Sequence, residues 1–164
     1  MATINVGSTV SVCDLHSLMV PELSALERLS RTHPWSERML NDSLQAGAIG
    51  LVLQSNEELL AYGLFSVVLD CGDLLNICVR RKVQNQGLGG VLLDALMVRA
   101  KQAGVVNLQL EVRQSSRIAQ ALYIRRGFEE QGVRPDYYRT TLGREDALLM
   151  GKCLGTAGIA SRNL

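Results

Sequence analysis

The sequence predicts an α/β or α+β sandwich that contains at least one pair of parallel strands. In the second half of the chain the expected elements alternate as strand, helix, strand, helix and strand, and parallel strands need helical crossovers of this kind. The helix expected over Leu88–Ala103 has one apolar stripe and stops at Gly104. The segment Val105–Val112, which follows at once, alternates apolar and polar residues as a half-buried strand does.

The first half supplies two helices and three strands. Leucines near helical spacing predict the first helix, the loop before Pro34 ends it, and Ser36 is the expected cap of the second helix. A turn over residues 55–58 joins two apolar segments into a hairpin. The expected helices cover Asp14–Arg31 and a segment from Ser36, and the expected strands are Ile49–Gln54, Ala61–Leu69 and Leu74–Val79.

The second half ends with one more helix and two strands. Ser115 or Ser116 can cap a helix that runs to Arg126, with Gly127 as its C-terminal glycine. The last strands are expected over Phe128–Val133 and Asp146–Met150. Because apolar periodicity stops there, we expect one domain over residues 1–150 and a flexible tail over 151–164.

Composition excludes several classes of protein. The chain has 164 residues, of which 47% are hydrophobic and 20% charged, as in a globular domain able to bury a core. Its formal net charge of +1 argues against a non-specific nucleic-acid binder. No apolar run reaches the roughly 20 residues of a membrane span, and the N-terminus has no signal-peptide pattern. We expect a soluble cytoplasmic protein that contacts neither membranes nor nucleic acid.

The four cysteines and two histidines do not have the spacing of a metal site. Free thiols in a reducing compartment are the expected state of the cysteines, and no metal is expected. The cysteines are Cys13, Cys71, Cys78 and Cys153.

The strongest local signal is the glycine-rich loop between the strand that ends at Val79 and the helix that begins near Leu88. Its residues Asn85 to Gly90 read N-Q-G-L-G-G. A glycine-rich turn that opens a helix exposes backbone N–H groups to an anion, and phosphate is the natural ligand. The spacing matches neither the dinucleotide fingerprint nor the P-loop. A packing turn without a ligand is the alternative.

Gln84, Gly87 and Gly89 match the Q/R-x-x-G-x-G/A signature, and with it the chain resembles the Gcn5-related N-acetyltransferases (GNAT). Further segments resemble the RimI-type ribosomal-protein alanine N-acetyltransferases over about residues 10 to 150. These segments are Pro34-Trp35-Ser36, Asn76–Val79, Leu110–Arg113, Ala121–Phe128, Asp136–Tyr138 and Gly143–Ala147. The resemblance implies a mixed, mostly antiparallel sheet with one splayed parallel pair, flanked by helices.

The resemblance also implies acetyl-CoA as co-substrate and direct transfer within a ternary complex. In that family the loop binds the pyrophosphate, and the preceding strand receives the pantetheine arm and the thioester. The implied cofactor contacts are Ile77, Cys78 and Val79 in the strand, Asn85, Gln86, Gly87, Leu88, Gly89 and Gly90 in the loop, and Ser116. Cys78 suggests an acetyl-thiol route, but no histidine lies beside it to activate a thiolate.

The resemblance to the family implies catalytic roles for two residues. Glu111 lies on the polar face of its strand and matches the proton acceptor of the family, whereas Tyr123 matches the proton donor to the leaving thiolate. Each also fits a structural role. Glu111 could be an exposed strand glutamate paired with Arg113 or Arg125, and Tyr123 could be a half-buried tyrosine of the core.

The chain departs from the family pattern at two positions. Ser116 stands where the RimI pattern has a cofactor-binding asparagine, and Gly90 stands where a basic residue is frequent. Coenzyme A affinity is the property that both departures affect. Arg80, Arg81 and Lys82 could supply the missing charge, or they could form a solvated basic run.

The implied acceptor is a protein N-terminus, and by resemblance the N-terminal alanine of small ribosomal subunit protein eighteen. An α-amine, with a pKa of about 7.7–8.0, needs a weaker base than a lysine amine at about 10.4. Trp35, Tyr137 and Tyr138 fall in segments that flank the peptide groove, where Glu145 or Asp146 would favour a basic peptide. The alternatives are transfer to a small amine or a lysine, and a catalytically silent acyl-CoA-binding module. The oligomeric state stays open.

Overall fold

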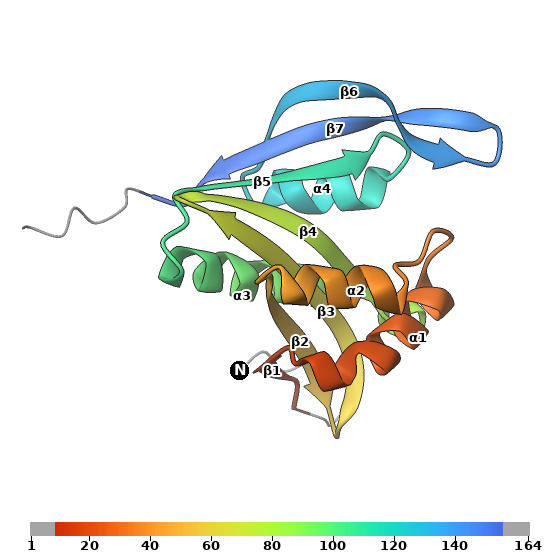
Figure 1. Ribbon diagram of the computed structural model, residues 1–164, viewed down its shortest axis with the longest axis vertical. Helices are drawn as coiled ribbons and strands as arrows, with labels where there is room; N and C mark the ends of the chain where they lie inside the picture. The colour runs from red at the N-terminus through yellow and green to blue at the C-terminus, as the bar shows by residue number, and fades with distance from the viewer. Residues whose placement is uncertain (1–8, 156–164) are drawn as a thin grey trace, which may run out of the picture.

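A computed structural model describes residues 9–155, which fold into a seven-stranded sheet with four α-helices (Figure 1). The strands are β1 Ser11–Asp14, β2 Ile49–Ser55, β3 Glu58–Val68, β4 Cys71–Val79, β5 Asn107–Arg113, β6 Glu129–Thr140 and β7 Gly143–Cys153. The α-helices are α1 Val20–Ser30, α2 Glu37–Gln45, α3 Leu88–Gln102 and α4 Arg117–Arg125. Short 3-10 turns, η1 Ser17–Met19 and η2 Arg81–Val83, precede α1 and α3.

The sheet has the strand order β1-β2-β3-β4-β5-β7-β6. Every neighbouring pair within residues 9–155 is antiparallel except β4 and β5, which are parallel and joined through α3. The expectation of a mostly antiparallel sheet with one parallel pair is therefore confirmed.

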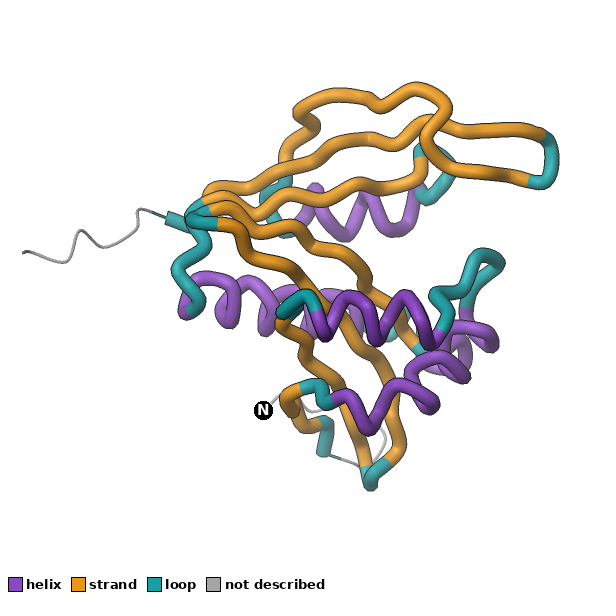
Figure 2. Tube along the Cα trace, in the orientation of Figure 1, coloured by secondary structure: helices purple, strands orange, loops and turns teal. Residues whose placement is uncertain are grey.

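The parallel pair separates halfway along its length. The register joins Cys71–Leu74 of β4 to Asn107–Leu110 of β5 and ends there, although β4 continues to Val79 and β5 to Arg113. Beyond that point β4 stays paired with β3, and β5 stays paired with β7. Figure 2 shows the two wings of the sheet diverging from this junction. We call the region between the diverging ends of β4 and β5 the splay.

Helices cover both faces of the sheet because the central strands are buried on both sides. Along β3, Tyr62 and Leu64 pack in one apolar cluster with α1 and α2. Ala61 and Phe65 point the other way, into a second cluster with α3 and α4. A strand buried on both faces reads as a continuous apolar run, and β3 does so from Leu59 to Phe65.

Three residues that were predicted to start or end a helix are confirmed in that position. Ser36 caps α2, with its hydroxyl accepting a hydrogen bond from the Met39 N–H at 3.2 Å. Gly104 follows α3 at φ +87°, and Gly127 follows α4 at φ +80°. Both glycines adopt the left-handed conformation that favours glycine at a helix end.

The first helix begins later than predicted. Residues Ser11–Asp14 form the edge strand β1 against β2, and α1 begins only at Val20 with a proline in its first turn. Asp14 is therefore the end of a strand and not the start of a helix. The helical leucine spacing extends across η1 into the preceding segment, so the spacing predicts a helix start that is too early.

The last two strands are longer than predicted. β6 reaches Thr140 and carries Tyr137 and Tyr138, but its register shifts between Arg134 and Tyr138, around Pro135. This irregularity breaks the alternation that identifies a strand. β7 continues to Cys153, so the first residues of the expected tail 151–164 belong to the sheet. Residues 156–164 lie outside the described part of the chain.

Residues 9–155 contain neither a membrane-spanning helix nor a cluster of metal-ligating side chains. No helix there is long and apolar enough to cross a membrane. Nor does any group of three or more potential metal-ligating side chains gather in that part of the chain.

Candidate active site

Near its C-terminal end, β4 has two residues whose backbone N–H and C=O groups face the splay. The Arg80 N–H donates to the Leu60 oxygen at 2.8 Å, which makes these two residues a bonded pair. Along an antiparallel ladder, hydrogen-bonded residue pairs alternate with pairs that are not hydrogen-bonded. The backbone of Cys78, two residues before Arg80, is therefore hydrogen-bonded to its partner Tyr62. The backbones of Ile77 and Val79 therefore face away from β3, toward the side where β5 has departed.

The two backbone carbonyl oxygens on this edge already accept hydrogen bonds from side chains. The Gln84 amide donates to the Val79 oxygen at 3.0 Å, and the Arg31 guanidinium donates to the Ile77 oxygen. The two N–H groups of Ile77 and Val79 are left as the donors that this edge presents to the splay. Such donors suit a ligand that carries amides and a carbonyl.

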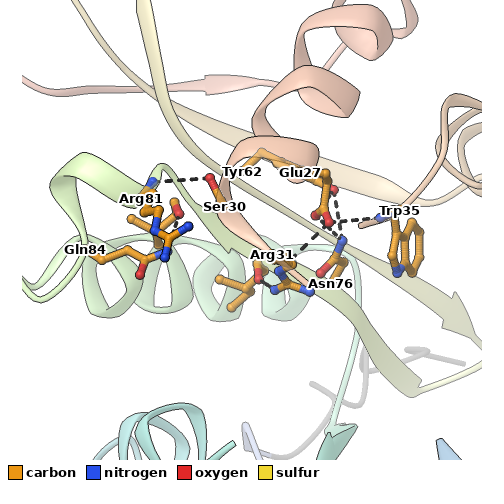
Figure 3. Close-up of polar contacts among 10 residues, drawn as sticks. Glu27, Ser30, Arg31, Trp35, Tyr62, Asn76, Arg81 and Gln84 are labelled. Atoms are coloured by element: carbon orange, nitrogen blue, oxygen red, sulfur yellow. Dashed lines mark hydrogen bonds and ion pairs between the residues drawn. The ribbon is translucent and has the colours of Figure 1, made fainter. Parts of the chain in front are cut away.

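A buried carboxylate holds Arg31 in place (Figure 3). Glu27 of α1 is fully buried and accepts hydrogen bonds from Tyr62 Oη at 2.7 Å, Asn76 Nδ2 at 2.8 Å and Trp35 N at 3.0 Å. The Arg31 Nε lies 3.9 Å from Glu27 Oε2. A buried carboxylate is stable only with this many donors, and here they connect α1, the loop before α2, β3 and β4.

This network was not predicted from the sequence, although the sequence contains a signal for it. Val20, Leu23, Ser24 and Glu27 share the buried face of α1. A glutamate at a position that the helical period assigns to the core is a reason to search for a buried polar cluster.

Cys78 occupies a different place from its neighbours in β4. Its backbone pairs with Tyr62, and its side chain lies in the cluster with α1 and α2. Burial, together with the nearby Glu27 carboxylate, raises the pKa of the thiol to about 12. Within the expected trio Ile77, Cys78 and Val79, the backbone of Cys78 therefore does not face the splay.

The glycine-rich loop opens α3 with the geometry of an anion-binding turn. Gly87 is the N-cap at φ +83°, a left-handed conformation, and it has no side chain to accept from the first turn. Leu88 is buried, and a Cβ on Gly89 would stand 3.4 Å from Leu122 of α4. The first turn of α3 therefore opens at this loop, where the Gly90 N–H already donates to the Gly87 oxygen at 3.0 Å. That Asn85 to Gly90 bind a phosphate stays a prediction.

Two of the three cations that precede the loop are paired with a carboxylate of β3. Arg80 and Lys82 both pair with Glu58 on β3, at 3.6 and 2.6 Å, and Arg80 also donates to the Leu59 oxygen. These two cations neutralise a surface carboxylate, and so they do not stand at the glycine loop.

Glu111 lies on β5 with its side chain opposite to Leu110 and Val112, on the sheet face that carries α1 and α2. Its carboxylate is one-quarter exposed and pairs with Arg134 of β6 at 2.9 Å. The Glu111 carboxylate beside the Tyr137 hydroxyl, together with burial, raises the pKa of Tyr137. The expected structural partners Arg113 and Arg125 are not the ones found.

Arg113 does not pair with Glu111 but contacts two other residues of this region. It pairs with Glu145 at 2.7 Å and lies 4.3 Å from the centroid of the Tyr138 ring. Tyr138 donates to the Glu111 backbone oxygen at 3.3 Å, and burial raises the pKa of its hydroxyl to about 12. Tyr138 thus lies beside Glu111, whereas the Glu145 carboxylate is committed to Arg113.

Tyr123 lies on α4, on the other face of the sheet. The side chain is buried in the cluster with α3 and meets the Phe128 ring edge to face at 5.8 Å. Burial raises the pKa of the Tyr123 hydroxyl, so the group stays protonated at neutral pH. Glu111 and Tyr123 therefore stand on opposite faces of the sheet, and the splay is the opening that connects the two faces.

Ser116 is the N-cap of α4, but its hydroxyl accepts no hydrogen bond from the helix. The side-chain capping expected of Ser115 or Ser116 is thus wrong for Ser116. Gln120 stabilises this end instead, donating to the backbone oxygens of Arg113 and Gln114, both at 2.9 Å.

Comparison with known proteins decides the family. The acetyltransferase (GNAT) family matches residues 15–128. The chain belongs to this family. It is an N-acetyltransferase, and acetyltransferases of this family use acetyl-CoA as the acetyl donor.

Individual relatives of this GNAT protein agree. It is 37% identical over 140 residues to the [ribosomal protein bS18]-alanine N-acetyltransferase of Escherichia coli K12, covering 85% of this chain and 95% of the relative. The crystal structure of the ribosomal-protein-S18-alanine N-acetyltransferase from Escherichia coli superposes with a TM-score of 0.87 at 36% identity, covering 93% of this chain and 98% of the other. A 16% identical acetyltransferase from Salmonella typhimurium, solved with acetyl-CoA, shares the fold with a TM-score of 0.75, covering 94% and 99% of the two chains.

Proposed function

We propose that this GNAT enzyme acetylates a protein N-terminus, and that its substrate is the N-terminal alanine of ribosomal protein bS18. The observation that carries the proposal is the placement of Glu111 and Tyr123 on opposite faces of the sheet, with Glu111 just beyond the last β5 residue that pairs with β4. An acceptor amine can then approach from one face while the leaving thiolate is met from the other. The Escherichia coli relatives named for bS18 support the choice of acceptor.

Glu111 is the proposed base. Its carboxylate already binds a cation, since Arg134 pairs with it at 2.9 Å. The same carboxylate can receive the acceptor's ammonium group, hold it at the splay and accept its proton, directly or through one water. Tyr137 and Tyr138 lie beside this position, which supports the proposal that they border the peptide groove.

The residues of the splay and the glycine loop fit acetyl-CoA. Acetyl-CoA supplies an acetyl group activated as a thioester. Ile77 and Val79 offer backbone N–H donors to its carbonyl and amide groups, and Asn85 to Gly90 offer the first turn of α3 to its phosphates. Ser116 offers a hydroxyl that the helix does not use.

Tyr123 is the proposed acid, which gives its phenolic proton to the departing sulfur. Its raised pKa keeps this proton in place until negative charge develops on the thiolate. Cys78 has no part in this scheme, because a buried thiol with a pKa of about 12 is not a nucleophile at neutral pH. The proposed scheme is direct transfer within a ternary complex, the mechanism that the family resemblance implies.

Two basic peptides test the function. One begins with a free alanine, and the other has a blocked N-terminus and an internal lysine. With acetyl-CoA, we expect a mass increase of one acetyl group on the first peptide only. Acetylation of the second peptide would indicate a lysine acetyltransferase. Bound acetyl-CoA without transfer to either peptide would indicate a different acceptor or a silent module. The expected cytoplasmic location stays a prediction.

A further inference from the structure

A guanidinium group occupies the position that a side chain at residue 90 would fill. Gly90 is the third residue of α3, in the turn that follows the glycine loop. A Cβ built on Gly90 would stand 2.0 Å from Arg126 Nη2 and 2.6 Å from Arg126 Cζ, closer than atoms approach. The cationic group of Arg126 therefore lies directly against the first turn of α3.

Arg126 reaches this place from the C-terminal end of α4. Its Nε lies 3.3 Å from Oδ1 of Asp94, and its Nη2 lies 3.5 Å from Oδ2. Asp94 follows Gly90 by one turn of α3, which fixes the guanidinium along that helix. The arginine side chain is about one-quarter exposed and its aspartate partner is about half exposed, so the pair borders solvent.

Arg126 supplies the positive charge that the sequence lacks at position 90. Position 90 lacks the basic residue that is frequent there in the family, and the nearby cations Arg80 and Lys82 are paired with Glu58. Arg126 comes from another helix, yet it returns a positive charge to the same turn.

We propose that Arg126 binds a phosphate group of acetyl-CoA in place of the side chain that Gly90 lacks. The proposal rests on the proposed role of Asn85 to Gly90 as the phosphate loop. A guanidinium donates two parallel hydrogen bonds to a phosphate, and the N–H groups of the first turn supply further donors. Asp94 occupies the guanidinium in the free protein, and the glycine at position 90 is what makes room for it.

Isothermal titration calorimetry of coenzyme A binding tests the proposal. Arg126→Gln is compared with Arg125→Gln, which removes the adjacent, exposed arginine. We expect Arg126→Gln to raise the Kd for coenzyme A about tenfold, the loss of one charge-assisted hydrogen bond, and Arg125→Gln to change it less than about twofold. The same titration with 3′-dephospho-coenzyme A identifies the phosphate: an equal loss indicates the diphosphate, and no loss indicates the 3′-phosphate.

Two further variants keep the test decisive. Gly90→Lys in the Arg126→Gln background should restore most of the affinity, because it returns a cation to the same turn. Asp94→Asn should tighten binding by removing the competing carboxylate, and it tests the proposal even if Arg126→Gln fails to fold.

Equal affinity of Arg126→Gln and Arg125→Gln for both ligands, or an unchanged Kd in Asp94→Asn, would refute the role of Arg126. Failure of the unaltered protein to bind coenzyme A at all would refute the phosphate loop itself.

Discussion

At the scale of single residues, the candidate site depends on contacts between segments far apart in the chain. Strand alternation predicted that Glu111 lies on a polar face, and the structure places it there. Its partner Arg134 could not be predicted, because the two residues are brought together by the irregular part of β6. The alternative partner Arg113 fails because Glu145 binds it at 2.7 Å.

Removing either proposed catalytic group should depress turnover and leave the cofactor bound. Glu111→Gln and Tyr123→Phe should each lower kcat by about 100-fold or more, the usual contribution of a positioned acid or base. The coenzyme A Kd should change less than about twofold, well under the tenfold that 1.4 kcal/mol represents. Steady-state kinetics and calorimetry on the same preparations measure both quantities.

Glu130→Gln is the matched control for Glu111→Gln, since Glu130 is an exposed glutamate on the neighbouring strand β6. It should retain full activity. Full activity of Glu111→Gln and Tyr123→Phe would show that the assigned roles are wrong, even if the enzyme acetylates the expected substrate.

The hydrogen-bond partners of Glu27 could not be predicted from the residue pattern. Helical periodicity assigns its position to the core, but the donors that make a carboxylate tolerable there come from β3, β4 and the loop before α2. Such a network is a property of the folded protein. The residues that hold Arg31 at the splay were therefore found only in the structure.

At the scale of elements, local signals worked best where a helix has clear start and stop residues. The predicted α3 boundaries agree with the structure to within one residue, because Gly87 and Gly104 mark the two ends. The β1 strand was not predicted, and only the first part of β6 was. β1 is a four-residue edge strand, and β6 is interrupted near Pro135, so neither has the sustained alternation that identifies a strand.

The start of α3 offers a test at this scale. Gly87 has φ +83°, and a Cβ there would meet no atom within 4 Å, so Gly87→Ala introduces conformational strain without a clash. We expect a loss of about 1–2 kcal/mol in the free energy of unfolding and a weaker affinity for coenzyme A, because the strained turn shifts the N–H groups. Denaturant titration and calorimetry measure the two effects.

Gly47→Ala is the matched control. Gly47 has φ +91° and equally open surroundings, but it lies in the turn after α2. It should cost similar stability and leave the coenzyme A Kd unchanged. Equal Kd values for the two variants would show that the turn at Gly87 does not bind the cofactor.

At the scale of the whole molecule, the splay joins two halves of one sheet that each keep their own pairing. β1 to β4 form one wing and β5 to β7 the other, held together by the short parallel register between β4 and β5. The residue pattern alone predicted a mixed fold with a parallel pair. The separation of that pair was implied by family resemblance, because where two strands stop pairing depends on how both wings twist.

The same arrangement explains why one opening can serve two substrates. The face with α1 and α2 carries Glu111, and the face with α3 and α4 carries Tyr123 and the glycine loop. At pH 7 about a tenth of an α-amine is neutral, against less than about a thousandth of a lysine amine. One carboxylate at this opening therefore suffices for an N-terminal acceptor.

The most direct test of this account is internal competition within one basic peptide that begins with alanine and contains one lysine. Tandem mass spectrometry after brief reaction with acetyl-CoA at pH 7 locates the acetyl group. We predict that it resides on the α-amine and that the lysine stays unmodified. Acetyl groups on the lysine, with the N-terminal alanine free, would contradict the account.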